Sequence, residues 1–159
     1  MNWIKPDRIY VSIDQIDFTA LAGSGKRLIL LDIDNTLVHH GAHQADDFAR
    51  RIVQRIKAAG LTPYIISNAK PSRAKLFANS LGIAFQGLSG KPSTRGLQRA
   101  MNEVGCPAHE TVMIGDQLFT DVLAARRAGV LAVLVLPLDS HEVWNVAIKR
   151  AFEWPFLRQ

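Results

Sequence analysis

Cysteine is almost missing from this sequence, and long apolar runs are missing altogether. The 159 residues include one cysteine, Cys106, so a disulfide within the chain is excluded. The histidines lack the spacing of metal ligands, which argues against a structural zinc site. No apolar stretch is long enough to span a membrane, and residues 1–30 lack the basic-then-apolar order of a signal peptide. We therefore expect a cytoplasmic protein that is neither exported nor integral to a membrane.

The excess of positive charge is small and spread along the chain. Lys and Arg number 19 and Asp and Glu number 14. Such a balance suits phosphate-bearing partners, which could be nucleic acid, anionic lipid or an acidic substrate. Because 48% of the residues are hydrophobic, the chain can bury a large core without covalent cross-links. We expect one domain that spans residues 1–159.

Short apolar runs alternate with helical patterns along the chain. The runs predict strands at residues 28–32, 64–67, 83–85, 111–115 and 131–136. The helical patterns predict helices at residues 46–60, 71–81, 94–104, 120–128 and 142–152. Gly82, Gly105 and Gly129 stand where helix ends are expected. This alternation predicts an α/β fold, a single Rossmann-like three-layer domain with a mainly parallel sheet covered by helices.

Two carboxylates follow the apolar run at residues 28–31. Asp32 and Asp34 belong to the segment Asp-Ile-Asp-Asn-Thr-Leu at residues 32–37. The carboxyl ends of parallel strands are ligand-binding positions, and two carboxylates are unfavourable there unless a cation holds them. One carboxylate can serve as metal ligand and nucleophile while the other exchanges a proton with a leaving group, which suits phosphoryl transfer through an aspartyl-phosphate. The alternative is a strand-to-helix turn in which these residues only form capping hydrogen bonds.

Three later segments place polar side chains at strand ends or in loops. They contribute Ser67, Asn68, Lys91, Asp116 and Asp121. In a parallel sheet the strand ends share one edge, so we expect these side chains to converge with the first two carboxylates. Turn formation alone does not explain the convergence of four separate segments.

In this order the four segments resemble the motifs of the haloacid dehalogenase superfamily of phosphatases. The resemblance extends to the YqeG-type phosphatases of subfamily IIIA, whose relatives include mitochondrial phosphatidylglycerophosphate phosphatases. It covers essentially the whole chain and depends above all on Gly-Asp-Gln-Leu-Phe-Thr-Asp-Val at residues 115–122. The sequence departs from the family pattern at residues 67–69, which read Ser-Asn-Ala, and at residues 123–127, which read Leu-Ala-Ala-Arg-Arg.

The resemblance implies a role for each matching position and implies Mg²⁺ as the cofactor. Asp32 would be the nucleophile and Asp34 the general acid and base. The implied sets are catalytic Asp32, Asp34, Ser67 and Lys91, phosphate-binding Ser67, Asn68 and Lys91, metal-binding Asp32, Asp34 and Asp116, and supporting Asp121 and Thr36. The pattern leaves open whether Asp121 supports the metal or pairs with the lysine.

Only short segments, at residues 38–45 and 82–91, stand where this superfamily usually inserts a cap domain. We therefore expect no cap domain and an open active site. Water would then be excluded by the substrate or by a partner surface, which favours a large substrate or one embedded in a surface. His39, His40 and His43 lie in the first segment, where a solvated cluster is favoured over contact with substrate.

The carboxyl-terminal segment combines aromatic and basic residues. Trp144, Ile148 and Phe152 are spaced by four and form one apolar stripe beside Lys149 and Arg150. The favoured interpretation is that this stripe packs on the sheet. The alternative is a peripheral contact with the inner face of an anionic membrane, which would suit a phospholipid head group as substrate.

Two further patterns are interpreted as structural. The glycines at residues 22–26 precede a strand instead of joining it to a helix, so they predict a flexible turn and not a nucleotide-binding loop. Arg126 and Arg127 lie late in a helix, where they favour the helix dipole, and we expect no nucleic-acid partner.

The predicted function is that of a Mg²⁺-dependent phosphomonoesterase, with phosphatidylglycerophosphate as the substrate that the resemblance implies. A phosphate-accepting regulatory protein and a non-catalytic binding protein on the same fold are the alternatives. The sequence carries no signal for the oligomeric state.

Overall fold

The computed structural model describes residues 4–138 of the chain. The predicted helix at residues 142–152 and its aromatic and basic side chains lie outside the described residues. Among residues 4–138, no helix is both long and apolar enough to cross a membrane.

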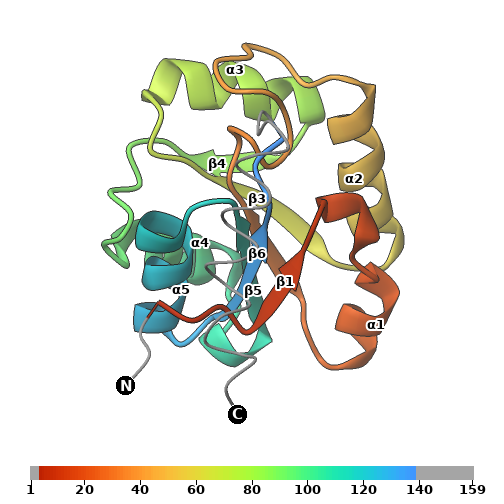
Figure 1. Cartoon of the computed structure of the whole chain (residues 1–159), viewed down its shortest axis with the longest axis vertical. Coiled ribbons are helices and arrows are strands. Elements are labelled where there is room, and N and C mark those ends of the chain that lie inside the picture. Colours follow the sequence, from red (N-terminus) through yellow and green to blue (C-terminus); the bar gives the residue numbers. More distant parts are fainter. Residues whose placement is uncertain (1–3, 139–159) are drawn as a thin grey trace.

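Six strands form one parallel sheet in the order β1-β6-β5-β2-β3-β4 (Figure 1). The strands are β1 (Arg8–Tyr10), β2 (Leu28–Leu31), β3 (Thr62–Ile66), β4 (Ala84–Gln86), β5 (Thr111–Gly115) and β6 (Leu131–Val135). From β2 the chain proceeds outward to β3 and β4, and then returns to β5 on the other side of β2. The carboxyl ends of β2 and β5 therefore flank the point at which the strand order reverses, where open α/β sheets bind ligands.

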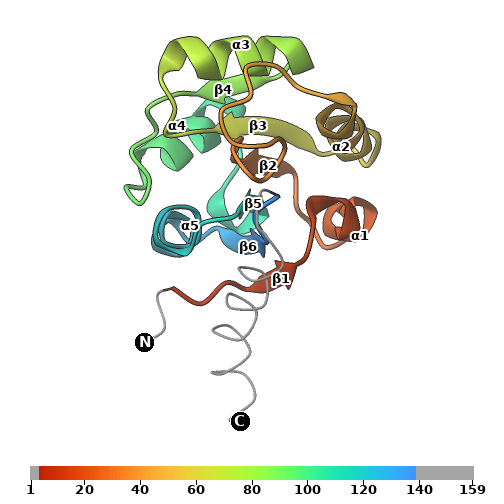
Figure 2. The ribbon, with the colours of Figure 1, turned by 45° about the horizontal axis from the view of Figure 1, so that its top comes forward.

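Helices cover both faces of this sheet. They are α1 (Phe18–Gly23), α2 (Asp47–Ala58), α3 (Pro71–Leu81), α4 (Arg95–Val104) and α5 (Leu123–Ala128), and a π-helical turn at Leu118–Val122 precedes α5. Figure 2 shows α1 and α2 on one side of the sheet and α4 and α5 on the other. The three-layer α/β arrangement that the sequence predicts is confirmed.

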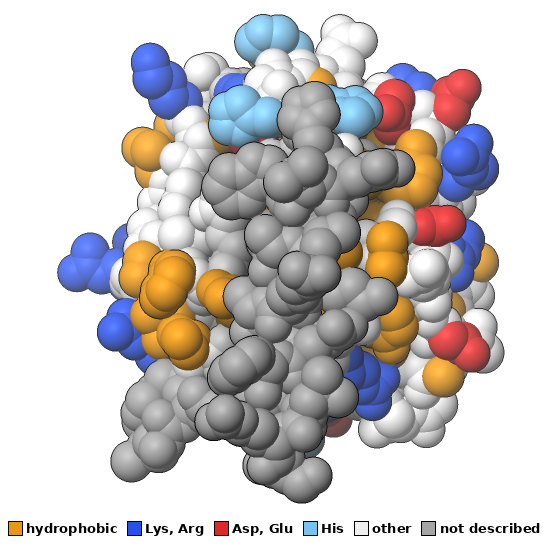
Figure 3. Space-filling model, viewed as in Figure 1, with side chains coloured by type: hydrophobic (Ala, Val, Ile, Leu, Met, Phe, Trp, Pro, Cys, Tyr) orange, Lys and Arg blue, Asp and Glu red, His pale blue; other side chains and the backbone are white. Residues whose placement is uncertain are grey.

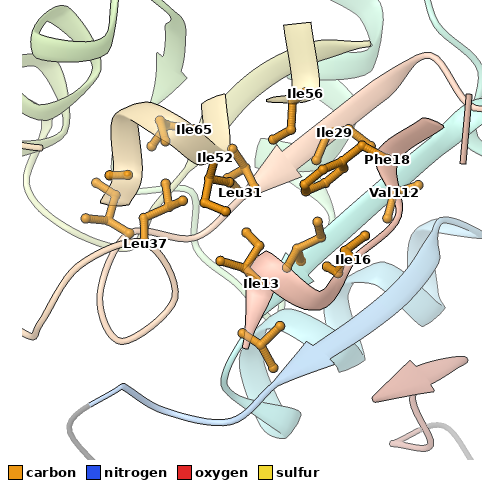
Figure 4. Packing of buried hydrophobic residues seen from close by; sticks show 14 of the residues in the cluster. Ile13, Ile16, Phe18, Ile29, Leu31, Leu37, Ile52, Ile56, Ile65 and Val112 are labelled. Carbon is orange, nitrogen blue, oxygen red and sulfur yellow. The ribbon is translucent and has the colours of Figure 1, made fainter. Parts of the chain in front are cut away.

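Alternate residues of β2 enter two hydrophobic clusters, one on each face. Ile29 and Leu31 join the cluster that contains Phe18 of α1 and Ile52 and Ile56 of α2 (Figure 4). Leu28 and Leu30 join the cluster formed with α4 and α5. The whole strand is buried because successive side chains point to opposite faces and both faces are covered. Burial of each such side chain stabilises the fold by about 1.5–3 kcal/mol.

Local sequence explains where the helices begin and end. The Asp46 side chain accepts a hydrogen bond from the backbone N–H of Ala49 at 2.8 Å and caps α2. Pro71 occupies the first position of α3, where its missing N–H costs no helical bond. Gly82 ends α3 with a φ of 67°, in the left-handed region that favours glycine.

The predicted elements from residue 28 to residue 136 are present, with small shifts of their ends. The sequence patterns missed β1 and α1, and the predicted turn at residues 22–26 is partly wrong because α1 extends to Gly23. The connection between β2 and α2 holds no helix or strand, and residues 82–91 hold only β4. Within residues 4–138, neither predicted insertion position carries a cap domain.

Candidate active site

Asp32 and Asp116 meet at the reversal point of the sheet. Asp32 directly follows β2, and Asp116 directly follows β5. The Asp32 backbone N–H donates to the Ile114 carbonyl at 3.1 Å, which continues the β2–β5 pairing up to the nucleophile candidate. Asp32, Asp116 and Asp121 each offer a carboxylate oxygen, and these oxygens lie within 4.8 Å of one another. Residues more than eighty positions apart thus form one acidic cluster.

A buried lysine compensates part of this negative charge. Lys91 Nζ donates to Asp32 Oδ1 at 3.0 Å, to Asp121 Oδ1 at 2.5 Å and to the Ile66 carbonyl at 3.0 Å. An ammonium has three donors, and here each has an acceptor. Burial lowers the pKa of Lys91, but the carboxylates of Asp32 and Asp121 outweigh it and raise that pKa above its usual value, so the lysine stays charged. Asp121, whose role the sequence left open, pairs with the lysine in this structure.

Gly115 makes room for Asp121. A Cβ atom on Gly115 would lie 2.2 Å from Asp121 Oδ2, a distance that real Cβ contacts do not reach. The same Asp121 oxygen accepts a hydrogen bond from the Gln117 backbone N–H at 3.2 Å, which fixes the carboxylate within the π-helical turn. The glycine of the Gly-Asp pair is therefore a steric requirement for the Asp121–Lys91 contact.

The acidic cluster raises the pKa of two of its members. Burial, and then the charge of Asp121, raise the pKa of Asp32 to about 6, against the lowering effect of Lys91. Burial and the charges of Asp32 and Asp121 raise the pKa of Asp116 to about 8. Asp116 Oδ1 is buried and has no hydrogen-bond partner among the described residues. An orphaned oxygen beside two further carboxylates fits a divalent cation, which prefers such hard ligands.

Asp34 lies outside this cluster and contacts an arginine. Arg73 Nη1 donates to Asp34 Oδ2 and Arg73 Nη2 to Asp34 Oδ1, both at 2.7 Å. The Gly41 backbone N–H also donates to Asp34 Oδ1, at 2.9 Å. Burial opposes ionisation, but these hydrogen bonds and the charge of Arg73 lower the pKa of Asp34 below its usual value. The carboxylate predicted to exchange protons is thus held in its ionised form.

Arg73 is a site residue that the sequence interpretation missed. It lies in the first turn of α3, the helix that follows the Ser67 segment. A helix that starts directly after a strand end returns its first turn to the same edge of the sheet, and this positional signal could have identified the residue.

The Ser67–Asn68 pair joins the second and third motif segments. Asn68 Nδ2 donates to the Lys91 carbonyl at 3.0 Å, and Asn68 Oδ1 accepts from the Lys91 backbone N–H at 3.0 Å and from Ser89 Oγ at 2.9 Å. The Asn68 amide therefore holds the lysine loop in place. Ser67 Oγ accepts from the Ala69 backbone N–H at 3.0 Å.

Thr36 is buried in the reversing loop that follows Asp34. Asn35 adopts a φ of 58°, which asparagine tolerates well, and its N–H donates to the Val38 carbonyl at 2.7 Å. Thr36 Oγ1 has no hydrogen-bond partner among the described residues. A backbone hydrogen bond thus closes a tight turn immediately after the second carboxylate.

A cavity of about 690 Å³ opens beside these residues. Its wall includes Asp32, Asp34, Ser67, Asn68, His40, His43, Lys70, Arg73 and Leu76. His40 and His43 thus line the cavity, although a solvated cluster was the favoured interpretation, and the His40 side chain is 75% exposed. Figure 3 shows histidine side chains gathered at the end of the molecule where Figure 1 places the loop between β2 and α2.

Comparison with known proteins places this chain in a family. A family model for haloacid dehalogenase-like hydrolases matches residues 42–129. The chain is 32% identical to the "Probable phosphatase YqeG" of Bacillus subtilis over 96% of its own length and 88% of that protein. It is 29% and 30% identical to phosphatidylglycerophosphate phosphatase 1 of Chlamydomonas reinhardtii and of Arabidopsis thaliana, and spans 56% and 43% of their lengths.

Solved structures show the same fold. The cobalt-bound deoxy-D-mannose-octulosonate 8-phosphate phosphatase of Haemophilus influenzae aligns with a TM-score of 0.58 at 17% identity, over 80% of this chain and 75% of that one. An uncharacterized Listeria monocytogenes protein aligns with a TM-score of 0.58 at 16% identity, over 73% of this chain and 84% of that one. From the family match and the relative that it resembles over nearly its whole length, the chain belongs to the haloacid dehalogenase-like hydrolase family and is a phosphatase of that family.

Proposed function

We propose that this phosphatase is a Mg²⁺-dependent phosphomonoesterase that acts through an aspartyl-phosphate on Asp32. The observation that carries the proposal is the acidic cluster itself. Asp32 lines the cavity, its carboxylate contacts the buried Lys91, and the orphaned Asp116 oxygen lies nearby. The ammonium of Lys91 offsets the charge of Asp32, and the Asp32 carboxylate is accessible from the cavity. Such a carboxylate is suited to attack an electrophile.

The reaction would proceed in two displacements at phosphorus. In the first, a carboxylate oxygen of Asp32 bonds to phosphorus and the bond from phosphorus to the alcohol oxygen breaks. Asp34, after it has left Arg73 and taken up a proton from solvent, gives that proton to the departing oxygen. In the second, Asp34 takes a proton from water, the water oxygen bonds to phosphorus, and the bond to Asp32 breaks. Inorganic phosphate leaves, Asp32 is a free carboxylate again, and Asp34 returns its proton to solvent when it pairs with Arg73 again.

The remaining residues would bind and orient the phosphate. Ser67 and Asn68 line the cavity beside Asp32, so their polar groups lie within reach of phosphate oxygens there. Lys91 donates its three hydrogen bonds to Asp32, Asp121 and a backbone carbonyl, and its side chain is 2% exposed. Its part would be to keep Asp32 charged and oriented, with any direct phosphate contact made only after it exchanges one of these partners.

Asp32 and Asp116 would hold Mg²⁺, with Asp121 supporting them from the lysine side. Bound there, Mg²⁺ would neutralise charge on the cluster and on the transferred phosphate. Asp34 is engaged by Arg73, so its carboxylate would join the metal only after leaving that pair.

For the substrate we propose phosphatidylglycerophosphate, the compound that two of the relatives are named for. Exposed apolar side chains near the cavity support a lipid substrate. Leu76 lines the cavity and is 58% exposed, and Phe119, next to the lining residue Thr120, is 67% exposed. Such side chains beside an open cavity can contact the apolar part of a lipid whose head group enters it. The carboxyl-terminal aromatic residues, for which a membrane contact was the alternative to packing on the sheet, lie outside the described residues.

The experiment that tests the reaction is acid quenching during turnover of an aryl phosphate with Mg²⁺, followed by mass spectrometry of the digested protein. We expect one phosphoryl group on the peptide that contains Asp32. A phosphoryl group on another residue would contradict Asp32 as the nucleophile, and rapid turnover without a modified peptide at any quench time would contradict the covalent mechanism. A stable modification without turnover would support the phosphate-accepting regulatory protein instead.

A further inference from the structure

Arg73 makes more contacts than the proposed reaction explains. Its guanidinium contacts both oxygens of Asp34, and on the other side it donates to the Ala42 carbonyl from Nη2 at 2.7 Å and from Nε at 3.2 Å. The side chain is 18% exposed and forms part of the cavity wall. It therefore connects α3 with two positions in the loop between β2 and α2, Asp34 near its start and Ala42 further along.

This pairing conflicts with the role proposed for Asp34. To exchange a proton with a leaving group, Asp34 must present a carboxylate oxygen to it, and both oxygens face the arginine fork. Breaking the pair without replacement would leave a partly buried charge without its partner, which is costly. A substrate anion that takes the place of Asp34 on Arg73 keeps the guanidinium paired, because the guanidinium fork matches phosphate as well as carboxylate. The freed Asp34 can then take up the proton that it must give to the leaving group.

The cavity lining holds two cations beside the carboxylates of Asp32 and Asp34. Lys91 contacts Asp32 from a buried position outside the cavity lining, whereas Lys70 and Arg73 belong to the lining itself. The Ala42 carbonyl accepts from the guanidinium independently of Asp34, so Arg73 keeps an anchor at the wall when Asp34 turns away.

We propose that Arg73 is a specificity-determining residue that binds a second anionic group of the substrate, a phosphate or phosphodiester separate from the transferred one. Binding of this group releases Asp34 toward the leaving oxygen. The inference rests on the proposed phosphomonoesterase function and narrows its substrates to phosphomonoesters with a second phosphate group. A lipid head group and a nucleotide can both supply that chemistry.

The test compares substrates with and without the second anion. Glycerol 3-phosphate has only the phosphate to be transferred, glycerophosphoglycerol phosphate adds a phosphodiester, and adenosine 3′,5′-bisphosphate carries a second phosphate on a nucleotide. We expect the wild type to prefer at least one of the two-anion substrates by roughly tenfold or more in kcat/KM. Which of the two is preferred distinguishes a lipid head group from a nucleotide.

Variants of Arg73 then test whether this residue causes the preference for a two-anion substrate. Arg73→Ala and Arg73→Lys should raise KM for the preferred two-anion substrate by roughly tenfold or more, since lysine keeps the charge but not the fork. Loss of the Asp34 contact alters the activity on every substrate, so the expected result is a difference: kcat/KM for the preferred two-anion substrate should fall by roughly tenfold or more beyond the fall for glycerol 3-phosphate. Lys75→Ala, on the exposed side of the same helix, is the matched control and should leave every substrate unchanged.

Three results would overturn the inference. One is a wild type without preference, and another is an equal loss for all substrates in both Arg73 variants, which would leave the arginine a positioning role only. The third comes from calorimetry of Asp32→Asn, which measures binding without turnover. The comparison is between Asp32→Asn and the double variant that also carries Arg73→Ala. If both proteins bind glycerophosphoglycerol phosphate and adenosine 3′,5′-bisphosphate with equal affinity, Arg73 does not bind the second anion. If only the proposed phosphatase reaction is wrong, no substrate will release phosphate, but binding of the two-anion compounds will still depend on Arg73.

Discussion

Charge compensation in a buried setting governs the individual residues of this site. Lys91 offsets part of the charge of Asp32 and Asp121, and Arg73 offsets that of Asp34. Asp116 has no cationic contact among the described residues, and its pKa of about 8 follows from burial beside other carboxylates. A group with this environment favours either a proton or a metal ion, and the two compete for it.

Replacing Lys91 should destabilise the protein strongly. Lys91→Met leaves Asp32 and Asp121 buried without their shared cation, and the loss of one partner from a buried ion pair costs about 3–5 kcal/mol. Urea denaturation measures the free energy of unfolding, and Lys75→Met, an exposed lysine on α3, serves as the control. A loss below about 1 kcal/mol, the range of exposed pairs, would show that the lysine is not the main compensating charge.

Stability without metal should fall as the pH rises. Asp32 and Asp116 have raised pKa values of about 6 and about 8, so the folded chain binds more protons than the unfolded chain above the ordinary carboxyl pKa. By linkage, the free energy of unfolding decreases as the pH rises from the ordinary carboxyl pKa of about 4 through the two raised values. The stability that comes from the extra protons is complete only below the pKa of the unfolded chain.

Denaturation in chelator at pH 5, 6, 7 and 8 measures this slope. Asp116→Asn should flatten it above pH 6, and Mg²⁺ should stabilise the wild type more at pH 8 than at pH 6 because it binds the ionised carboxylates. A wild-type stability that rises steadily from pH 5 to pH 8 in chelator would refute the assignment of these pKa shifts.

At the scale of elements, burial on both faces made the central strands predictable. β2 and β5 are fully buried, so they read as continuous apolar runs, and the glycines after α3, α4 and α5 marked the helix ends. β1 has only three residues and two of them are exposed, and α1 has only six residues. Elements this short carry too few positions to establish a period. Unlike the three-residue β4, which follows the helix end at Gly82, β1 and α1 follow no helix end that marks their place, and the patterns missed them.

The turn that follows β5 provides a prediction at this scale. Gly115→Ala would place a methyl group 2.2 Å from Asp121 Oδ2, so the π-helical turn must shift and the Asp121–Lys91 contact must open. Overpacking of this kind costs about 1–3 kcal/mol, and phosphatase activity should fall by roughly tenfold or more. Gly23→Ala, where nothing lies within 4 Å, is the control. Unchanged activity and melting temperature in Gly115→Ala would show that the turn tolerates the methyl group.

For the molecule as a whole, parallel topology explains how distant segments meet. The order of strands and helices was sufficient to predict that Asp32, Ser67, Lys91 and Asp116 reach one edge, since parallel strands share their carboxyl ends. The pairing within the site was not predictable in the same way. The burial of Lys91 and its contact with Asp121 depend on loop geometry, and the contact of Arg73 with Asp34 depends on how α3 meets the loop between β2 and α2.

The measurement that tests the central claim most directly is phosphate release from p-nitrophenyl phosphate by the wild type and by Asp32→Asn, both with Mg²⁺. Asp47→Asn, an exposed carboxylate at the start of α2, is the control and should match the wild type. An amide cannot attack phosphorus, so Asp32→Asn should lose on the order of a thousandfold or more in kcat while keeping the wild-type fold. A rate for Asp32→Asn near that of the wild type would show that Asp32 is not the nucleophile.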